Sequence, residues 1–296
     1  MSERLADISA RIDNVRQLGS VVTAMRGIAA SRAQQSRNLL AGVEAYGEAI
    51  SVAIGEALNF LTDPAPARRP GTGYALILFC AEQGFAGGLS DRMLEAAEPI
   101  EPDTHLIVIG SRGGAIAQER GYAVSRTIAM ATQSGAVPDV ANLIADTLYA
   151  AIAAGTVARV GILYPRWDNG RDQRIERVAL FPIDREKFRQ PVAALPPLAT
   201  LKPETLIERL TAEYVYARLC EAAMHAFAAE NQARMETMGA ASTNIDRTLD
   251  SLKQRENQVR QAEVTAEIVE LSANGAEVPV NKSRRQAPFP LRGPTL

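Results

Sequence analysis

The fold is decided by residues 204–278, which read ETLIERLTAEYVYARLCEAAMHAFAAENQARMETMGAASTNIDRTLDSLKQRENQVRQAEVTAEIVELSANGAEV. The stretch has no proline, and its apolar residues recur at alternating steps of three and four positions. That spacing is typical of a helix with one continuous apolar seam. A helix reaching Asn274 would be roughly 105 Å long, so a compact domain could not cover it and it needs a partner. The predicted seam residues are Met235, Met238, Ile245, Leu249, Leu252, Val259 and Ala266.

A second proline-free segment, residues 1–63, supplies that partner. Its apolar positions follow the same three-four spacing, whereas all sixteen prolines of the chain lie outside the two segments. Because proline removes a helix hydrogen bond and clashes with the preceding turn, its absence favours long helices. We therefore predict an antiparallel coiled coil of an N-terminal helix, residues 1–63, and a C-terminal helix, residues 204–274. The N-terminal seam positions are Leu5, Ile8, Ile12, Val15, Gly19, Val22 and Ala29.

The segment between the helices, residues 74–190, alternates short apolar runs with helical patterns. Strand-helix-strand order implies a parallel sheet with helices packed on it, so we predict a Rossmann-like α/β domain inserted between the paired helices. After the C-terminal helix, residues 275–296 contain four prolines, which predicts a disordered tail. Strands are expected at Tyr74–Cys80, His105–Gly110, Ala158–Tyr164 and Arg174–Ile183, and helices at Leu89–Ala97, Gly113–Glu119 and Asp139–Ala154.

Composition restricts the classes of function. A net charge of −2 argues against general nucleic-acid binding, which requires a basic surface. The longest apolar stretches, such as Ala75–Ala81, are far below the ~20 residues that span a bilayer. The two cysteines, Cys80 and Cys220, are expected to pack in a reducing compartment. The sequence therefore predicts a cytosolic protein, or one bound to the cytosolic side of a membrane.

Two glycine-rich loops each allow two interpretations. Residues 82–88, EQGFAGG, follow the first predicted strand and precede a helix, where an α/β protein binds phosphate. They match neither GxGxxG nor the end of a P-loop, so a tight turn that needs glycine is the alternative. Residues 110–114, GSRGG, leave the same two interpretations open.

We predict no catalytic, cofactor-binding or metal-binding residues. The histidines, His105 and His225, are far apart and have no carboxylate or cysteine at ligand spacing in the sequence. No other constellation of residues indicates catalysis. We therefore do not expect the chain to carry out chemistry by itself.

Motifs at both ends and in the middle of the chain are similar to the gamma subunit of the F-type ATP synthase. The resemblance covers nearly the whole chain to about Ala276, with the motifs in the same order as in the family. The motifs are RIDNV at 11–15 and AMRGIAASR at 24–32, similar to RIxSV and AMKMVAAxK; EQGFAGGL at 82–89, similar to DRGLCGGL; Glu230 with Ala233-Arg234-Met235 and Met238, similar to SExxARMxAM; and RQAEVTAEIVEL at 260–271, similar to RQAxITxEIxEI.

The resemblance implies a function. Gamma subunits form the central rotor shaft: their paired helices stand inside a ring of alpha and beta subunits, and their α/β domain lies near the epsilon subunit and the ring of c subunits. Proton or sodium flow turns the c ring and the shaft together. The chain is thereby expected to be a non-catalytic, peripheral subunit on the cytoplasmic face of a bacterial plasma membrane, without cofactors, membrane insertion or nucleic-acid binding.

The resemblance also implies which residues contact partners. Met25 and Arg26 stand where the shaft of the family meets the acidic torque-transmitting region of the beta subunits. Arg260, Gln261, Thr265 and Glu267 match positions that hydrogen-bond near the top of the ring. Residues four positions apart, such as Gln261 and Thr265, project from one face of a helix.

Some positions differ from the family pattern. Ser20 and Thr23 replace lysines, Glu256 replaces a tyrosine, and residues 198–200 lack the aromatic residues near the foot of the shaft. These differences leave open a variant or alternative form of the ATPase. Two other classes also stay open from the residues alone: an α/β nucleotide-binding enzyme with a coiled-coil oligomerisation arm, and a pure coiled-coil scaffold.

Overall fold

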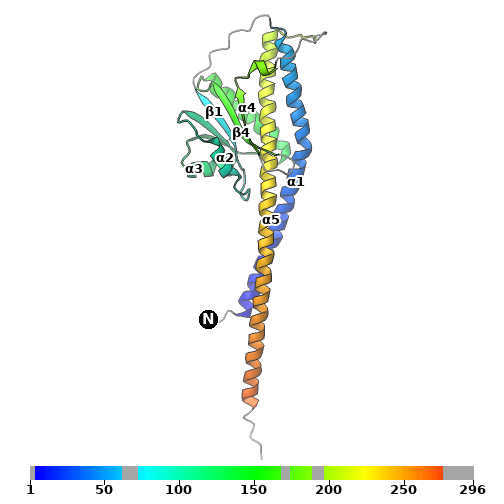
Figure 1. Ribbon diagram of the computed structural model, residues 1–296, viewed down its shortest axis with the longest axis vertical. Helices are drawn as coiled ribbons and strands as arrows, with labels where there is room; N and C mark the ends of the chain where they lie inside the picture. The colour runs from blue at the N-terminus through cyan, green and yellow to red at the C-terminus, as the bar shows by residue number, and fades with distance from the viewer. Residues whose placement is uncertain (1–3, 62–72, 168–173, 189–196, 276–296) are drawn as a thin grey trace, which may run out of the picture. The chain divides into compact units, whose positions relative to one another are not determined.

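The computed structural model describes residues 4–61, 73–167, 174–188 and 197–275. Two long helices stand at the ends of the chain, α1 (Leu5–Leu58) and α5 (Pro203–Gly275), and a mixed sheet lies between them in the sequence (Figure 1). This confirms the general architecture predicted from the distribution of proline. The predicted tail, from residue 276 onward, lies outside the described residues.

The chain divides into two compact units. The first contains residues up to Leu18 and from Ile245 onward, which are the start of α1 and the last part of α5. In this unit Ile8 and Ile12 of α1 are 0% and 3% exposed, and Ile245 of α5 is 9% exposed. The apolar seam predicted from the sequence is therefore the buried stripe of both helix segments.

The seam of α5 is shorter than predicted. Leu249, Leu252 and Val259 are half-buried at the expected spacing, but every residue from 260 to 273 is exposed. The prediction that Ala266 belongs to the seam is therefore wrong. The three-four pattern continues along the helix after the last residue that packs against another element, because periodicity alone does not record where a partner ends.

The second unit contains residues 19–244, with the remainder of both long helices and the whole sheet. Here α1 and α5 are joined by hydrogen bonds from Arg37 to Gln232 (2.9 Å) and from the Tyr46 hydroxyl to Glu213 (2.8 Å). Residue numbers rise along α1 as they fall along α5, so the two helices are antiparallel in this unit.

The sheet has five strands in the order β3-β2-β1-β4-β5. Strands β1 to β4 run parallel to one another, whereas β5 pairs with β4 in the antiparallel direction. The prediction missed β3 because the side chains of residues 125–127 within it are exposed, so that strand lacks an apolar run. The strands are β1 (Tyr74–Phe79), β2 (Thr104–Ile109), β3 (Val124–Ile128), β4 (Arg159–Arg166) and β5 (Arg174–Phe181).

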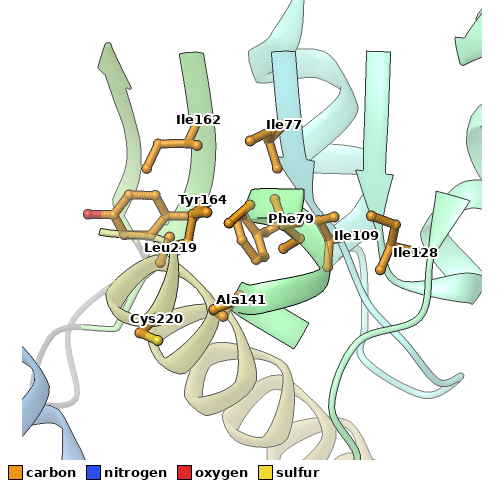
Figure 2. Close-up of a cluster of buried hydrophobic side chains, with 14 of the residues drawn as sticks. Ile77, Phe79, Ile109, Ile128, Ala141, Ile162, Tyr164, Leu219 and Cys220 are labelled. Atoms are coloured by element: carbon orange, nitrogen blue, oxygen red, sulfur yellow. The ribbon is translucent and has the colours of Figure 1, made fainter. Parts of the chain in front are cut away.

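Helices cover both faces of the sheet. Because side chains alternate along a strand, Leu76 and Leu78 of β1 pack in one core with α2 and α3, whereas Ile77 and Phe79 pack in the other with α4 and α5. Figure 2 shows this second core, with Leu219 and Ala141 facing the strands. The covering helices are α2 (Leu89–Ala97), α3 (Ser111–Glu119) and α4 (Val137–Ala153); short 3-10 turns lie at η1 (Ser134–Ala136) and η2 (Arg185–Phe188).

One segment, Ser134–Ala153, is long and apolar enough to cross a membrane by length and composition alone. The sequence prediction, which found no such run, overlooked it. Its side chains Val137, Ile144 and Leu148 are at most 2% exposed and belong to the core between the sheet and α5. This packing accounts for part of the apolar character only, because 28% of the segment is buried and Leu143 and Tyr149 are 45% and 39% exposed.

Candidate functional site

The most completely buried part of α5 is residues 219–231, in which no residue is half-buried or exposed. Five of these residues are alanines, which let the sheet, α4 and α1 approach the helix closely. Burial on all sides is typical of a helix inside a core rather than at its surface. The polar residues in this stretch therefore require internal partners.

Glu230 has such partners in the loop after β1. Its carboxylate accepts hydrogen bonds from the backbone N–H groups of Glu82 (3.0 Å) and Gln83 (3.1 Å). Arg234, one turn further along α5, donates to the same carboxylate at 2.5 Å. The side chain of Glu230 is 4% exposed and that of Arg234 is 7% exposed. A buried carboxylate is thus satisfied by two backbone donors and one guanidinium.

Arg234 holds the loop from the other direction. Its guanidinium donates to the carbonyl oxygens of Gly84 (3.2 Å) and Gln83 (3.4 Å), and to the side-chain oxygen of Asn231 (3.3 Å). The Glu230 carboxylate therefore accepts from the backbone N–H groups of the loop, and the Arg234 guanidinium donates to its backbone carbonyl groups. We call this set, Glu230 and Arg234 with residues 82–84, the loop clasp.

Glu82 extends the loop clasp to the next strand-to-helix turn. Its carboxylate accepts from the backbone N–H of Ser111 (2.8 Å), the hydroxyl of Ser111 (2.9 Å) and the backbone N–H of Met130 (2.7 Å). Ser111 begins α3, where free N–H groups and the helix dipole favour an anion. Two carboxylates thus connect α5, the loop after β1, α3 and the segment after β3.

This arrangement distinguishes between the two interpretations of the glycine-rich loops. Three backbone N–H donors of these loops, those of Glu82, Gln83 and Ser111, are already bonded to the carboxylates of Glu230 and Glu82. Gly87 has a φ of +57°, a conformation that favours glycine. A Cβ on Gly113 would lie 2.1 Å from the Cβ of Cys80, so this glycine permits α3 to pack on β1. The geometry favours tight turns over nucleotide sites.

A second group of ionisable side chains, of which His225 and Glu221 are buried, lies where α1, β4 and α5 meet. His225, whose side chain is 3% exposed, has its Nε2 atom 3.3 Å from Glu44 Oε1. Arg166 of β4 pairs with Glu44 at 3.1 Å and with Glu176 of β5 at 3.0 Å. We call this the histidine cluster; its remaining members are Glu221 and Arg218 on α5 and Tyr164 on β4.

Burial controls the protonation of the histidine cluster. Burial, followed by the positive charge of Arg166, lowers the pKa of His225, so the imidazole is neutral at pH 7. Burial raises the pKa of Glu221, although Arg218 at 2.5 Å and Arg166 oppose the shift. Burial also raises the pKa of Tyr164 above its usual value.

The expectation that His225 has no carboxylate at ligand spacing is wrong. Glu221 precedes it by four residues and shares its helix face, a signal that was present in the sequence. Glu44 comes from the other end of the chain and could not be connected to His225 by spacing. The role of Glu230 and Arg234 was also missed, although their own four-residue spacing within an alanine-rich stretch is a sign of a buried ion pair.

The six predicted contact residues lie on two different units. Met25 is half-buried and Arg26 is exposed, both on the α1 segment of the second unit. The other four, on α5 in the first unit, are exposed. There the Thr265 hydroxyl donates to the carbonyl of Gln261 (2.7 Å), and Arg260 lies 3.6 Å from Glu256 rather than pairing with Glu267. Their contacts with partners stay a prediction.

The same end of α5 exposes large apolar side chains. Val264, Ile268, Val269 and Leu271 are between 49% and 67% exposed. Four such side chains within eight residues of one helix form a concentrated apolar surface, which in soluble proteins marks an interaction site.

Comparison with known proteins identifies the family. A model of the family described as ATP synthase matches residues 4–277. The chain belongs to the ATP synthase family. Among its curated relatives are the ATP synthase gamma chains of Frankia casuarinae and Acidithiobacillus ferrooxidans, 28% and 26% identical to it. Each alignment covers 92% of this chain, and 96% and 98% of the relative. The predicted resemblance to gamma subunits is confirmed.

Solved structures of the ATP synthase family share the fold. The rotor of Euglena gracilis mitochondrial ATP synthase matches with a TM-score of 0.62 at 14% identity, over 88% of this chain and 98% of that chain. The OSCP/F1/c-ring structure of the same enzyme gives a TM-score of 0.61 at 13% identity, over 95% of this chain. Such low identity compares folds only, so the roles of individual residues rest on the geometry above.

Proposed function

We propose that this gamma-type chain is the central rotor shaft of an F-type ATP synthase, in which α1 and α5 act together as the shaft. It couples ion flow through a membrane sector to ATP synthesis or hydrolysis in a ring of alpha and beta subunits. The chain itself is non-catalytic, and its α/β part contacts the epsilon subunit and the c ring. The complex stands on the cytoplasmic face of a bacterial plasma membrane.

The observation that carries the proposal is the uncovered end of α5 in a chain of the ATP synthase family. Residues 260–273 form a regular helix, yet all of them are exposed and four carry large apolar side chains. A helix of this composition needs a surrounding surface to cover it. A ring of alpha and beta subunits around the shaft supplies such a surface, and Arg260, Gln261, Thr265 and Glu267 would make its polar contacts.

Reconstitution tests the proposal. The full chain is mixed with the alpha and beta subunits from the same source, and ATP hydrolysis by the purified complex is measured. We expect a complex containing one copy of this chain, with hydrolysis that depends on it, and no hydrolysis by the chain alone. A matched chain ending at residue 259, which keeps the buried seam, should assemble poorly or turn over slowly. Hydrolysis that is the same with and without this chain would refute the proposal.

Arg26 supplies a more specific test of torque transmission. We infer that its exposed guanidinium meets acidic groups of a beta subunit, so Arg26→Glu should lower turnover of the assembled complex more than it lowers assembly. Arg26→Lys keeps the charge and serves as the control, with a small expected loss. Equal losses of assembly and turnover in Arg26→Glu would mean that Arg26 has only a structural role.

A further inference from the structure

The histidine cluster combines three metal-ligating side chains from two helices. One ligand atom each from Glu44 of α1 and from Glu221 and His225 of α5 lie within 4.8 Å of one another. We propose that these three residues form a binding site for a divalent transition-metal ion of the zinc type. The site is independent of the proposed rotor function, and it would fasten α1 to α5 beside the sheet.

The state of His225 is the first argument. Its side chain is 3% exposed, and among the described residues Nδ1 has no hydrogen-bond partner, whereas Nε2 lies 3.3 Å from Glu44 Oε1 without the geometry of a hydrogen bond. A buried ring nitrogen without a partner is costly, and native proteins usually satisfy such atoms. A ring nitrogen that makes no hydrogen bond can offer its lone pair to a metal ion, and neutral imidazole is the form of histidine that binds metal.

Distances give the second argument. Zinc binds histidine nitrogen and carboxylate oxygen at about 2.0–2.2 Å in tetrahedral geometry, which separates neighbouring ligand atoms by about 3.3 Å. The Nε2 atom of His225 lies 3.3 Å from Glu44 Oε1. A ligand oxygen of Glu221, one helical turn before His225, lies within 4.8 Å of the other two ligand atoms. Arg218 holds this carboxylate at 2.5 Å, so metal binding would have to rearrange that contact. Nitrogen and oxygen donors in this combination suit zinc and cobalt.

The net charge of the cluster is the third argument. The cluster already contains two arginines, so it must have negative charge left over to attract a metal ion. Glu44, Glu176 and Glu221 face Arg166 and Arg218, so with a neutral His225 the cluster has one excess negative charge when all three carboxylates are ionised. Arg166 contacts Glu44 at 3.1 Å, and a metal ion would displace this contact. Arg166 would stay paired with Glu176 at 3.0 Å, and its side chain is 37% exposed, so it can move toward solvent.

The three ligands define what kind of site this is. Structural zinc sites usually have four protein ligands, whereas a three-ligand site leaves a position for water. The binding should therefore be weaker than in a zinc finger, and one ion per chain is expected. Because the ligands come from α1 and α5, binding should stabilise the folded chain in proportion to the free metal concentration.

The test uses the full-length chain after treatment with a chelator. Zn²⁺ is titrated by calorimetry, and Co²⁺ is titrated by its visible absorption, which reports four-coordinate nitrogen and oxygen ligation. We expect one ion per chain and a rise in the unfolding temperature with Zn²⁺. His225→Gln should weaken binding at least tenfold, whereas His105→Gln, at the other histidine of the chain, should leave it unchanged.

Two further variants keep the proposal open to refutation if His225→Gln folds poorly. Glu44→Gln changes a carboxylate that is 41% exposed, so it should preserve the fold while weakening binding. Arg166→Gln removes the competing cation and should tighten binding severalfold. No binding to the wild-type chain, or equal binding by the wild type, His225→Gln and Glu44→Gln, would overturn the proposal.

Discussion

Two stretches of the same helix differ completely in their surroundings. Residues 219–231 of α5 are buried all round, whereas residues 260–273 are exposed all round. Both are regular helix without proline or glycine. The difference shows that helix formation and packing are separate properties here: the first stretch is fixed by internal partners, and the second is left available to partners from outside the chain.

Composition reflects this difference. The buried stretch contains five alanines, and its two carboxylates, Glu221 and Glu230, are paired with Arg218 and Arg234. The exposed stretch has branched apolar side chains and charged residues without a common buried face. Substitutions of one type should therefore have unequal effects in the two stretches, and four predictions follow in order of expected effect.

The largest effect is expected at the loop clasp. Glu230→Ala removes the acceptor of two backbone N–H groups and leaves Arg234 buried without its carboxylate, which should cost about 3–5 kcal/mol of unfolding free energy. The measurement is urea unfolding followed by the fluorescence of Trp167, the single tryptophan of the chain. Glu267→Ala in the exposed stretch is the control, with a change within about 0.5 kcal/mol. Equal effects would show that the loop clasp does not stabilise the fold.

The second prediction compares the same substitution in both stretches. Ala223 is 0% exposed and lies in the core with the sheet, so Ala223→Leu should overpack it and cost about 1–3 kcal/mol. Ala266→Leu adds the same atoms to an exposed helix position and should be close to neutral. Thermal unfolding of the two variants measures the contrast, and a destabilised Ala266→Leu would mean that residue 266 is covered after all.

The sequence predicted the two long helices, but not which parts of them pack against the rest of the chain. Periodicity predicted α1, α5 and the seam as far as Val259, because apolar spacing follows helix geometry. It failed at Ala266, since the pattern does not record the length of the partner helix. It also missed β3, whose exposed residues 125–127 lack an apolar run. Strand-helix-strand order predicted a parallel sheet, but the order of the strands and the antiparallel direction of β5 came only from the structure.

The candidate sites were less predictable than the fold. Glu230 and Arg234 were noticed as part of a family motif, but their partners in residues 82–84 lie far away in the sequence. Glu44 and His225 meet only because α1 and α5 are antiparallel in that unit. Tertiary contacts of single polar residues leave no periodic signal, so spacing rules could not find them.

The third prediction concerns pH and the buried stretch. The lowered pKa of His225 means that the unfolded chain binds a proton there more readily than the folded chain. The contribution of His225 to stability is therefore complete above about pH 6.5, its unfolded value, and is lost as the pH falls toward the lower folded-state pKa. The groups facing it are Glu44, Tyr164, Arg166, Glu176, Arg218 and Glu221.

The measurement is the difference in unfolding free energy between wild type and His225→Gln, with a chelator present. Between pH 6.5 and 5 this difference should change by up to about 1.4 kcal/mol per pH unit, with the wild type losing more stability. Subtraction removes most of the opposing contribution of Glu221, whose raised pKa is common to both variants. A difference that does not vary with pH would contradict the prediction.

The smallest effect on stability is expected in the exposed stretch. Thr265→Val removes the hydroxyl that donates to the Gln261 carbonyl, which remains bonded within the helix, so the change should stay within about 0.5 kcal/mol. If Thr265 contacts the ring as proposed, ATP hydrolysis by the reconstituted complex should still fall. Thr243→Val, which removes an equivalent bond to the Gly239 carbonyl, is the control; an equal loss of activity in both variants would argue against a specific contact.

The loop clasp has a consequence for the behaviour of the chain in a cell. At the strand ends where related folds receive the phosphates of a nucleotide, this molecule inserts its own Glu230 and Glu82. In the proposed rotor role the chain would work beside subunits that bind ATP, and a nucleotide site of its own would make its stability depend on the ATP concentration. Because these backbone donors are bonded to the chain's own carboxylates, we expect the chain not to bind ATP at these strand ends.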